Sequence, residues 1–173
     1  MVTIQEEQTG TEALASMLEG ELSGWKQIVI LGIGNEFSGD DSLGFQAAQK
    51  LKRALSNISK VEVLAVGVAP ENFTGLLRKL SPSHVVLIDA AEMGEIAGTI
   101  KLIEPHRIEK RMPSTHTMPL YMLTEYLEQE IGTKVLILGI QPKSISVGAA
   151  VSDEVEVSID KLARLLAEMI NRR

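Results

Sequence analysis

Nearly continuous runs of apolar residues recur along the chain. They are Gln27–Ile33, Val61–Val68, Ser83–Ala90 and Lys134–Ile140. Short runs without polar alternation are typical of strands that are buried on both faces, as in parallel sheets. A further segment, Gly98–Ile103, alternates more and is predicted to be an edge strand or one arm of a hairpin.

Segments with helical spacing lie between and after these runs. They are Leu43–Leu55, Glu71–Leu80, Pro119–Ile131 and Asp153–Arg173. Strands that alternate with helices are the sequence pattern of a layered α/β domain. We therefore predict a three-layer α/β sandwich of the phosphorylase/hydrolase-like kind, with a five-stranded, mostly parallel twisted sheet between helices.

Residues 1–24 fall outside this alternation. Apolar residues at helical spacing run from Thr11, a suitable N-cap, to Leu22, and Gly24 ends the pattern. We predict an N-terminal helical extension over 1–24 that covers one edge of a single α/β domain over 25–173. The start resembles no signal peptide, and no stretch of about 18 apolar residues follows, so we expect a cytoplasmic protein without membrane insertion.

Composition narrows the classes of function. The 173 residues include no cysteine, which excludes disulfides, thiolate metal sites and a cysteine nucleophile. Aromatic residues make up 3% of the chain, and the formal net charge is −6. An acidic chain with few aromatic residues binds phosphate backbones and bases poorly, so we expect no nucleic-acid partner.

Ligands of open α/β sheets bind outside the carboxyl ends of the strands. The first apolar run ends at residues 32–34, Gly-Ile-Gly, which begin like a dinucleotide fingerprint, but Phe37 stands where the third glycine belongs. Asp40 and Asp41 follow, and their carboxylates would repel a pyrophosphate. A nucleotide-binding α/β protein is therefore a disfavoured alternative.

Acidic residues occur at two of the predicted strand ends. A helix has one N-cap, so at most one of Asp40 and Asp41 caps the helix that begins near Ser42. We expect Asp40 to be structural, as a cap or as a partner of backbone N–H groups in the Asn35–Gly39 turn. Asp89 ends the most apolar run, where a carboxylate needs a cation or, alternatively, neighbouring N–H groups.

Among the three histidines, His116 is the candidate ligand. His84 begins a strand and His106 lies in a charged segment, whereas His116 lies in a polar segment bracketed by prolines. Two carboxylates and one imidazole suit a borderline divalent metal, and three protein ligands leave room for water or substrate. Spacing alone does not define such a site, and a surface-loop histidine is the alternative.

The stretch from Ile30 to Gly44 resembles the opening motif of the nickel–iron hydrogenase maturation endopeptidases, G-x-G-N-x-x-x-x-D-[DE]-x-x-G. Residues 88–90, Ile-Asp-Ala, resemble the second acidic site of that family, and residues 114–116, Ser-Thr-His, resemble its histidine site. The order and spacing match, and the similarity extends from about Gln27 to Leu166.

The resemblance implies that Asp41, Asp89 and His116 contact a metal and serve catalysis, with Asp40 as a further candidate catalytic residue. It implies an aspartic-type endopeptidase, which activates a hydrogenase by removing a C-terminal extension from the nickel-loaded large-subunit precursor. Nickel would be carried by this substrate and not be permanently bound. We expect the protein to be a monomer or a weak dimer.

Alternatives remain open for both mechanism and function. The three residues could read nickel on the substrate, or hold a metal that activates water, or Asp40 or Asp41 could be a general base without a metal. A non-catalytic chaperone of the same fold, which binds the metal or the large subunit, would use the same residues.

Overall fold

The computed structural model describes residues 4–104 and 118–172, with side chains from residue 10 onward. Within these residues, five strands form one sheet: β1 (Ile28–Ile33), β2 (Val61–Gly67), β3 (His84–Ala90), β4 (Ile100–Ile103) and β5 (Lys134–Ile140). Their order is β2-β1-β3-β5-β4, and all neighbours are parallel except β4 and β5. The predicted mostly parallel sheet is confirmed, with Gly98–Ile103 as its edge.

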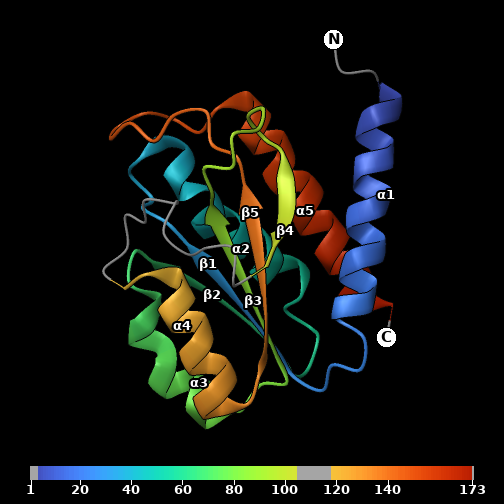
Figure 1. Ribbon diagram of the computed structural model, residues 1–173, viewed down its shortest axis with the longest axis vertical. Coiled ribbons are helices and arrows are strands. Elements are labelled where there is room, and N and C mark those ends of the chain that lie inside the picture. The colour runs from blue at the N-terminus through green and yellow to red at the C-terminus, as the bar shows by residue number, and fades with distance from the viewer. Residues whose placement is uncertain (1–3, 105–117, 173) are drawn as a thin grey trace.

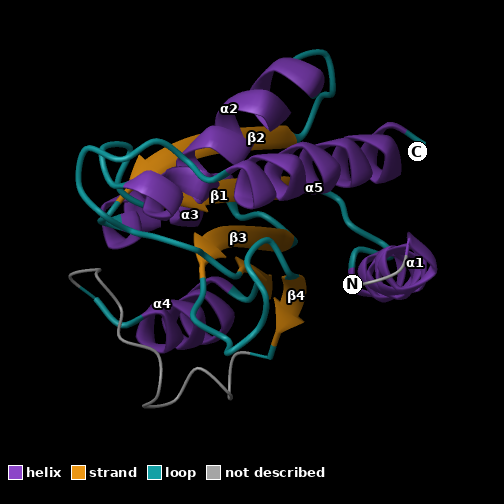
Figure 2. Ribbon diagram, turned by 90° about the horizontal axis from the view of Figure 1, so that it is seen from above, coloured by secondary structure: helices purple, strands orange, loops and turns teal. Residues whose placement is uncertain are grey.

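Helices cover both faces of the sheet (Figures 1 and 2). They are α1 (Ile4–Glu21), α2 (Leu43–Ala54), α3 (Thr74–Leu80), α4 (Leu120–Tyr126) and α5 (Asp153–Asn171). α2 and α5 pack on one face, and α3 and α4 pack on the other, which confirms the three-layer sandwich. None of the described helices is long and apolar enough to span a membrane.

The helix boundaries differ from the predicted ones in three places. α1 begins at Ile4, before the predicted cap at Thr11. The helix predicted from Glu71 is preceded by a 3₁₀ turn, η2 (Pro70–Phe73), and continues as α3. After α4 the chain forms a π-helical turn, η4 (Leu127–Ile131), which ends at Gly132 with a φ of 72°.

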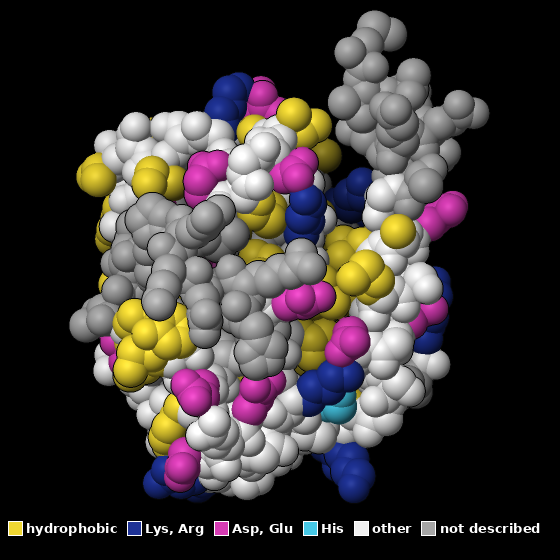
Figure 3. Space-filling model, in the orientation of Figure 1, with side chains coloured by type: hydrophobic (Ala, Val, Ile, Leu, Met, Phe, Trp, Pro, Cys, Tyr) yellow, Lys and Arg dark blue, Asp and Glu magenta, His cyan; other side chains and the backbone are white. Residues whose placement is uncertain are grey.

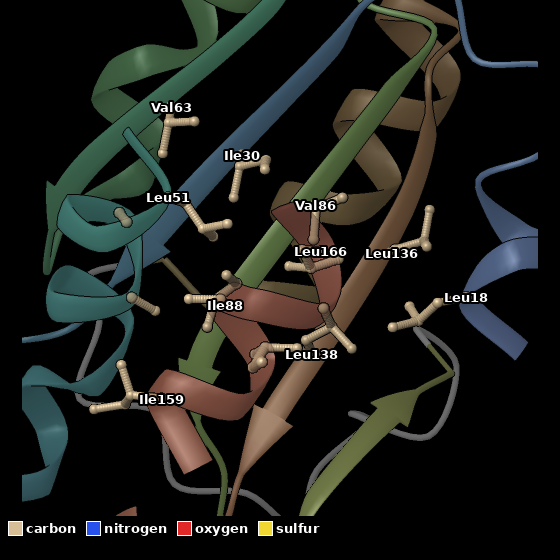
Figure 4. Close-up of a cluster of buried hydrophobic side chains, with 14 of the residues drawn as sticks. Leu18, Ile30, Leu51, Val63, Val86, Ile88, Leu136, Leu138, Ile159 and Leu166 are labelled. Carbon is tan, nitrogen blue, oxygen red and sulfur yellow. The ribbon is translucent and has the colours of Figure 1, made fainter. Parts of the chain in front are cut away.

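Strict alternation along the strands divides the core into two clusters. Ile30 and Val86 face α2 and α5, whereas their neighbours Leu31 and Leu87 face α3 and α4. Figure 4 shows the first cluster, in which strand side chains meet Leu51 of α2. Full burial of such a side chain stabilises the fold by about 1.5–3 kcal/mol, so both helical layers are held on the sheet by apolar packing.

α1 lies along the edge of the sheet, beside β4 and α5 (Figures 1 and 2). Leu14, Leu18 and Leu22 are buried in the cluster on the α2/α5 side. Figure 3 shows hydrophobic side chains gathered between this helix and the edge of the sheet. At the last residue of α1, Glu21 O accepts a hydrogen bond of 2.8 Å from Lys134 Nζ at the start of β5. The helical extension is therefore packed against the core.

The start of α2 lies directly on the backbone of two strands. A Cβ at Gly44 would lie 2.2 Å from Ile33 O in β1 and 2.3 Å from Ile88 O in β3, closer than real Cβ atoms approach. A Cβ at Gly32 would likewise lie 2.0 Å from Gly44 O. Glycine at both positions lets the helix begin against the carboxyl ends of β1 and β3.

Gly44→Ala is expected to destabilise the fold, because the new methyl group would collide with carbonyl groups of two strands. Overpacking costs about 1–3 kcal/mol, and we expect a loss at the upper end because the colliding atoms are backbone. Gly75→Ala in α3 is the matched control, since open space surrounds its Cβ, and it should gain up to about 1 kcal/mol. Equal free energies of unfolding in urea for the two variants would contradict this packing argument.

Candidate active site

The carboxyl ends of β1 and β3 form a topological switch point. β1 continues into the 3₁₀ turn η1 (Gly39–Ser42) and then α2 on one face, whereas the chain after β3 passes through β4 to α4 on the other. Chains that leave neighbouring strands toward opposite faces open a crevice where ligands bind. Asp41 in η1 and Asp89 near the end of β3 lie at these two strand ends.

Asp41 fixes the turn that follows β1. Its Oδ2 accepts a hydrogen bond of 3.0 Å from Asn35 N, and the residue is buried. The backbone is equally confined, because a Cβ at Gly34, whose φ is 133°, would lie 1.8 Å from Asp41 O. Contacts on both its main chain and its side chain therefore hold the carboxylate of Asp41 at the end of β1.

Asp89 is buried at the end of β3 and bonds to its own backbone neighbourhood. Its Oδ1 accepts a hydrogen bond of 2.8 Å from Ala90 N, so the backbone partner considered from the sequence is present. Because side chains alternate along a strand, Asp89 shares the face of Leu87, on the α3/α4 side, while Ile88 faces α2.

Asp40 is the most deeply buried acid of the site, with an exposed fraction of 0%. Its Oδ2 accepts hydrogen bonds from Lys143 N at 2.7 Å, Ser144 N at 3.0 Å and Ser152 Oγ at 2.9 Å. Its Oδ1 accepts one from Ser152 N at 2.7 Å. Burial opposes ionisation, but the hydrogen bonds from Ser152, Ser144 and Lys143 outweigh it and lower the pKa of Asp40 below its ordinary value of 3.8.

Asp40 has a structural role, as predicted, but the prediction of its hydrogen-bond partners was wrong. Neither η1 nor α2 has a side-chain cap, and the Asn35 turn is bonded by Asp41. Consecutive residues of a 3₁₀ helix diverge by about 120°, so neighbouring acids in η1 point to different partners. Asp40 reaches the loop between β5 and α5, over 143–152. Ser152 is the N-cap residue of α5, but its hydroxyl donates to Asp40 and does not cap the helix.

His116 lies outside the described residues, so the third predicted ligand is not placed. The described chain stops at Glu104, after β4, and resumes at Met118, just before α4. A short turn joins the end of η4 to the start of β5, so α4 and β5 run in opposite directions. The first residues of α4 therefore lie near the carboxyl end of β5. Within 4–104 and 118–172, no three acids or histidines are grouped closely enough to hold a metal ion.

Gln141 joins the end of β5 to the segment after β3, a role that the sequence did not reveal. It directly follows β5, and its buried amide binds the segment after β3: Oε1 accepts hydrogen bonds from Met93 N at 2.7 Å and Glu95 N at 3.3 Å. Its Nε2 donates to Glu92 Oε1 at 3.0 Å. The sequence did contain a sign of this role, because Gln141 is a polar residue at the end of a buried apolar run. That run forms β5, which is next to the strand of Asp89 in the sheet.

A wide hollow of 670 Å³ between α2 and α5 is a different feature. Its lining includes Lys50 and Asp160, whose Nζ and Oδ1 atoms pair at 2.5 Å. The hollow lies along the helices and is not lined by Asp41 or Asp89. The strand ends therefore remain the candidate site.

Comparison with known proteins decides the family. The model of the family described as HycI, hydrogenase maturation protease, matches residues 45–169, which is more than half of the chain. The chain belongs to this family. A Methanocaldococcus jannaschii protein provisionally named a hydrogenase maturation protease is 38% identical over 163 residues, which cover 91% of this chain and 96% of that protein. The hydrogenase 3 maturation protease of Escherichia coli K12 is 40% identical over 115 residues, or 66% of this chain and 72% of that protein.

Solved structures of other maturation proteases share the fold. The NiFe hydrogenase maturation protease HycI from Thermococcus kodakarensis KOD1 has a TM-score of 0.82 at 32% identity, with 90% of this chain and 99% of that chain covered. A crystal structure of the hydrogenase 3 maturation protease has a TM-score of 0.71 at 33% identity, with 80% and 87% covered. The predicted family and peptidase activity are confirmed.

Asp40→Asn is expected to destabilise this maturation protease by about 2–4 kcal/mol at pH 7, since the amide would place a donor against donors in a buried site. Asp160→Asn is the control, because it removes only an exposed ion pair with Lys50, worth about 0–1 kcal/mol. Urea unfolding of the wild type and both variants measures the two losses.

The loss should also depend on pH. The pKa of Asp40 is lowered in the folded state, so its ionised form contributes in full above about pH 4, and this contribution falls as the pH drops through the folded pKa. The difference in stability between wild type and Asp40→Asn should therefore shrink as the pH is lowered below about 4. A difference that grows on acidification would contradict the hydrogen-bonded carboxylate.

Proposed function

We propose that this protease removes the C-terminal extension of a hydrogenase large-subunit precursor after nickel has been inserted, and that Asp41, Asp89 and His116 contact this nickel. The observation that carries the proposal is the position of Asp41 and Asp89 at the ends of neighbouring strands at the switch point. Membership of the hydrogenase maturation protease family supports the kind of substrate.

The donor set suits nickel that arrives with the substrate. Two carboxylates and one imidazole are ligands that a borderline divalent ion accepts, and three ligands leave positions for groups of the precursor. Nickel is in this proposal part of the substrate. A precursor without the ion would bring no positive charge to Asp41 and Asp89, so selection for the loaded form follows from differential binding.

We assign the general base of the hydrolysis to Asp41 or Asp89 and not to Asp40. Asp40 is fully buried, and four hydrogen bonds saturate its carboxylate. Its lowered pKa also makes it a weak proton acceptor. Asp41 or Asp89 is the better candidate to activate water, whereas Asp40 holds the loop over 143–152 against η1.

The expected type of mechanism, the location and the oligomeric state remain predictions. An aspartic-type mechanism, a cytoplasmic location and a monomeric or weakly dimeric state belong to this proposal. The non-catalytic chaperone has no observation in its favour, since the matched family and the relatives described above are named as proteases.

Asp41→Asn, Asp89→Asn and His116→Ala are each expected to lower the rate of cleavage of nickel-loaded precursor by about 100-fold or more, because each removes a ligand or a base. His106→Ala is the matched control from the same part of the sequence and should cleave at the wild-type rate. The rate is measured as the appearance of the shortened large subunit on a gel. Wild-type cleavage by His116→Ala would show that His116 is a bystander.

Treatment of the purified protease with EDTA, followed by its removal, is expected to leave cleavage unchanged, because the nickel is supplied by the precursor. The same treatment of the precursor should abolish cleavage, and readdition of nickel to it should restore the product. Loss of activity on stripping the protease alone would instead indicate a resident metal that activates water.

A further inference from the structure

The loop between β5 and α5, over 143–152, lies directly against the turn that carries Asp41. Beyond the side-chain bonds of Asp40, Asp40 N donates to Ser144 O at 2.9 Å and Gly148 N donates to Phe37 O at 2.7 Å. The approach is close, since a Cβ at Gly39, whose φ is 52°, would lie 2.7 Å from Ser144 O. The loop is therefore a fixed part of the carboxyl edge.

This loop presents two apolar side chains, Ile145 and Val147, to solvent. Ser144 Oγ and Ser146 Oγ lie 3.1 Å apart, so these two side chains share one side of the segment. Ile145 lies between these two serines, and Val147 lies in the turn that follows, where Ala149 N donates a hydrogen bond of 3.2 Å to Ser146 O. Their exposed fractions are 50% and 83%, and that of Phe37, bonded to the same loop, is 68%.

The loop segment that carries Ile145 and Val147 is uncharged. Residues 144–152 contain no ionisable side chain, although 23% of the whole chain is charged. The flanking Lys143 is engaged, with its Nζ 2.6 Å from Glu154 Oε1. Exposed apolar side chains that gather on an ordered, neutral surface are typical of interaction sites, whereas isolated ones are common on any protein.

We propose that Phe37, Ile145 and Val147, here called the rim patch, dock apolar residues of the precursor polypeptide that flank the bond to be cleaved. The inference rests on the proposed function, because it takes that precursor as the occupant. A polypeptide with a peptide bond at Asp41 and Asp89 extends about 3.3 Å per residue, so residues on one side of that bond can reach the loop that is bonded to Asp40, the residue before Asp41. The rim patch thus contributes to KM and leaves the chemical step to the acids.

The test compares the double variant Ile145→Ser/Val147→Ser with the wild type on purified, nickel-loaded precursor. KM for cleavage and Kd by calorimetry should both rise about tenfold, as for the loss of a hot spot, while kcat stays within about twofold. Met17→Ser is the matched control, because Met17 is exposed to a similar degree as Ile145. It belongs to α1, which lies on the other side of the molecule from the loop between β5 and α5 (Figure 1), and the variant should change neither constant.

The outcomes separate this inference from the proposed function. If the wild type cleaves and the double variant has an unchanged KM and Kd, or if Met17→Ser weakens binding equally, the rim patch is overturned while the function stands. If the wild type binds the precursor without cleaving it and only the double variant loses binding, the rim patch stands and the proposed function is overturned. If the wild type neither binds nor cleaves, both are overturned.

Discussion

The arrangement of the site depends on a contact between backbones, at the point where α2 begins against the ends of β1 and β3. The absent side chain of Gly44 allows the helix to approach carbonyl groups of both strands, and Gly32 in β1 allows the same approach. Gly34, just after β1, lets the chain pass close to Asp41 O in η1. η1 is continuous with α2. The distance between α2 and the strand ends therefore also determines where Asp41 lies relative to the sheet. Added side-chain volume at this contact would lift η1 away from Asp89.

A second constraint joins parts of the chain that are distant in sequence. The carboxylate of Asp40 binds backbone donors 103 and 112 residues later. In a site shielded from water these charge-assisted hydrogen bonds are strong, and the loss of any partner would leave a buried charge or donor unsatisfied. The loop after β5 and the turn after β1 therefore form one unit, although the sheet places β3 between the two strands.

Much of the fold could be predicted because hydrophobic burial determines it. Three of the four apolar runs became the central strands β1, β3 and β5, since a strand covered on both faces admits few polar residues. The fourth run became β2, an edge strand that is only partly buried, so its predicted burial on both faces was wrong. The start of α1 escaped prediction because its first turns carry Glu and Gln, which favour helix without an apolar pattern. The partners of Asp40 escaped it because an acid before a helix suggests a cap, and no local pattern reveals donors in a distant loop. Asp41 and Asp89 were placed at strand ends from the sequence, whereas His116 is outside the described residues.

The rigidity of the two acids bears on how a maturation protease could refuse an empty precursor. Asp41 and Asp89 are each held by a backbone N–H group, so neither carboxylate turns back to water at little cost when a neutral polypeptide covers it. Covering a carboxylate without a cation removes its water and leaves its charge uncompensated. Under the proposed function, a nickel ion on the substrate would supply the compensating charge. Selectivity for the loaded precursor would then arise from acids that are fixed in advance, and the apolar rim patch would add affinity for both forms without discriminating between them.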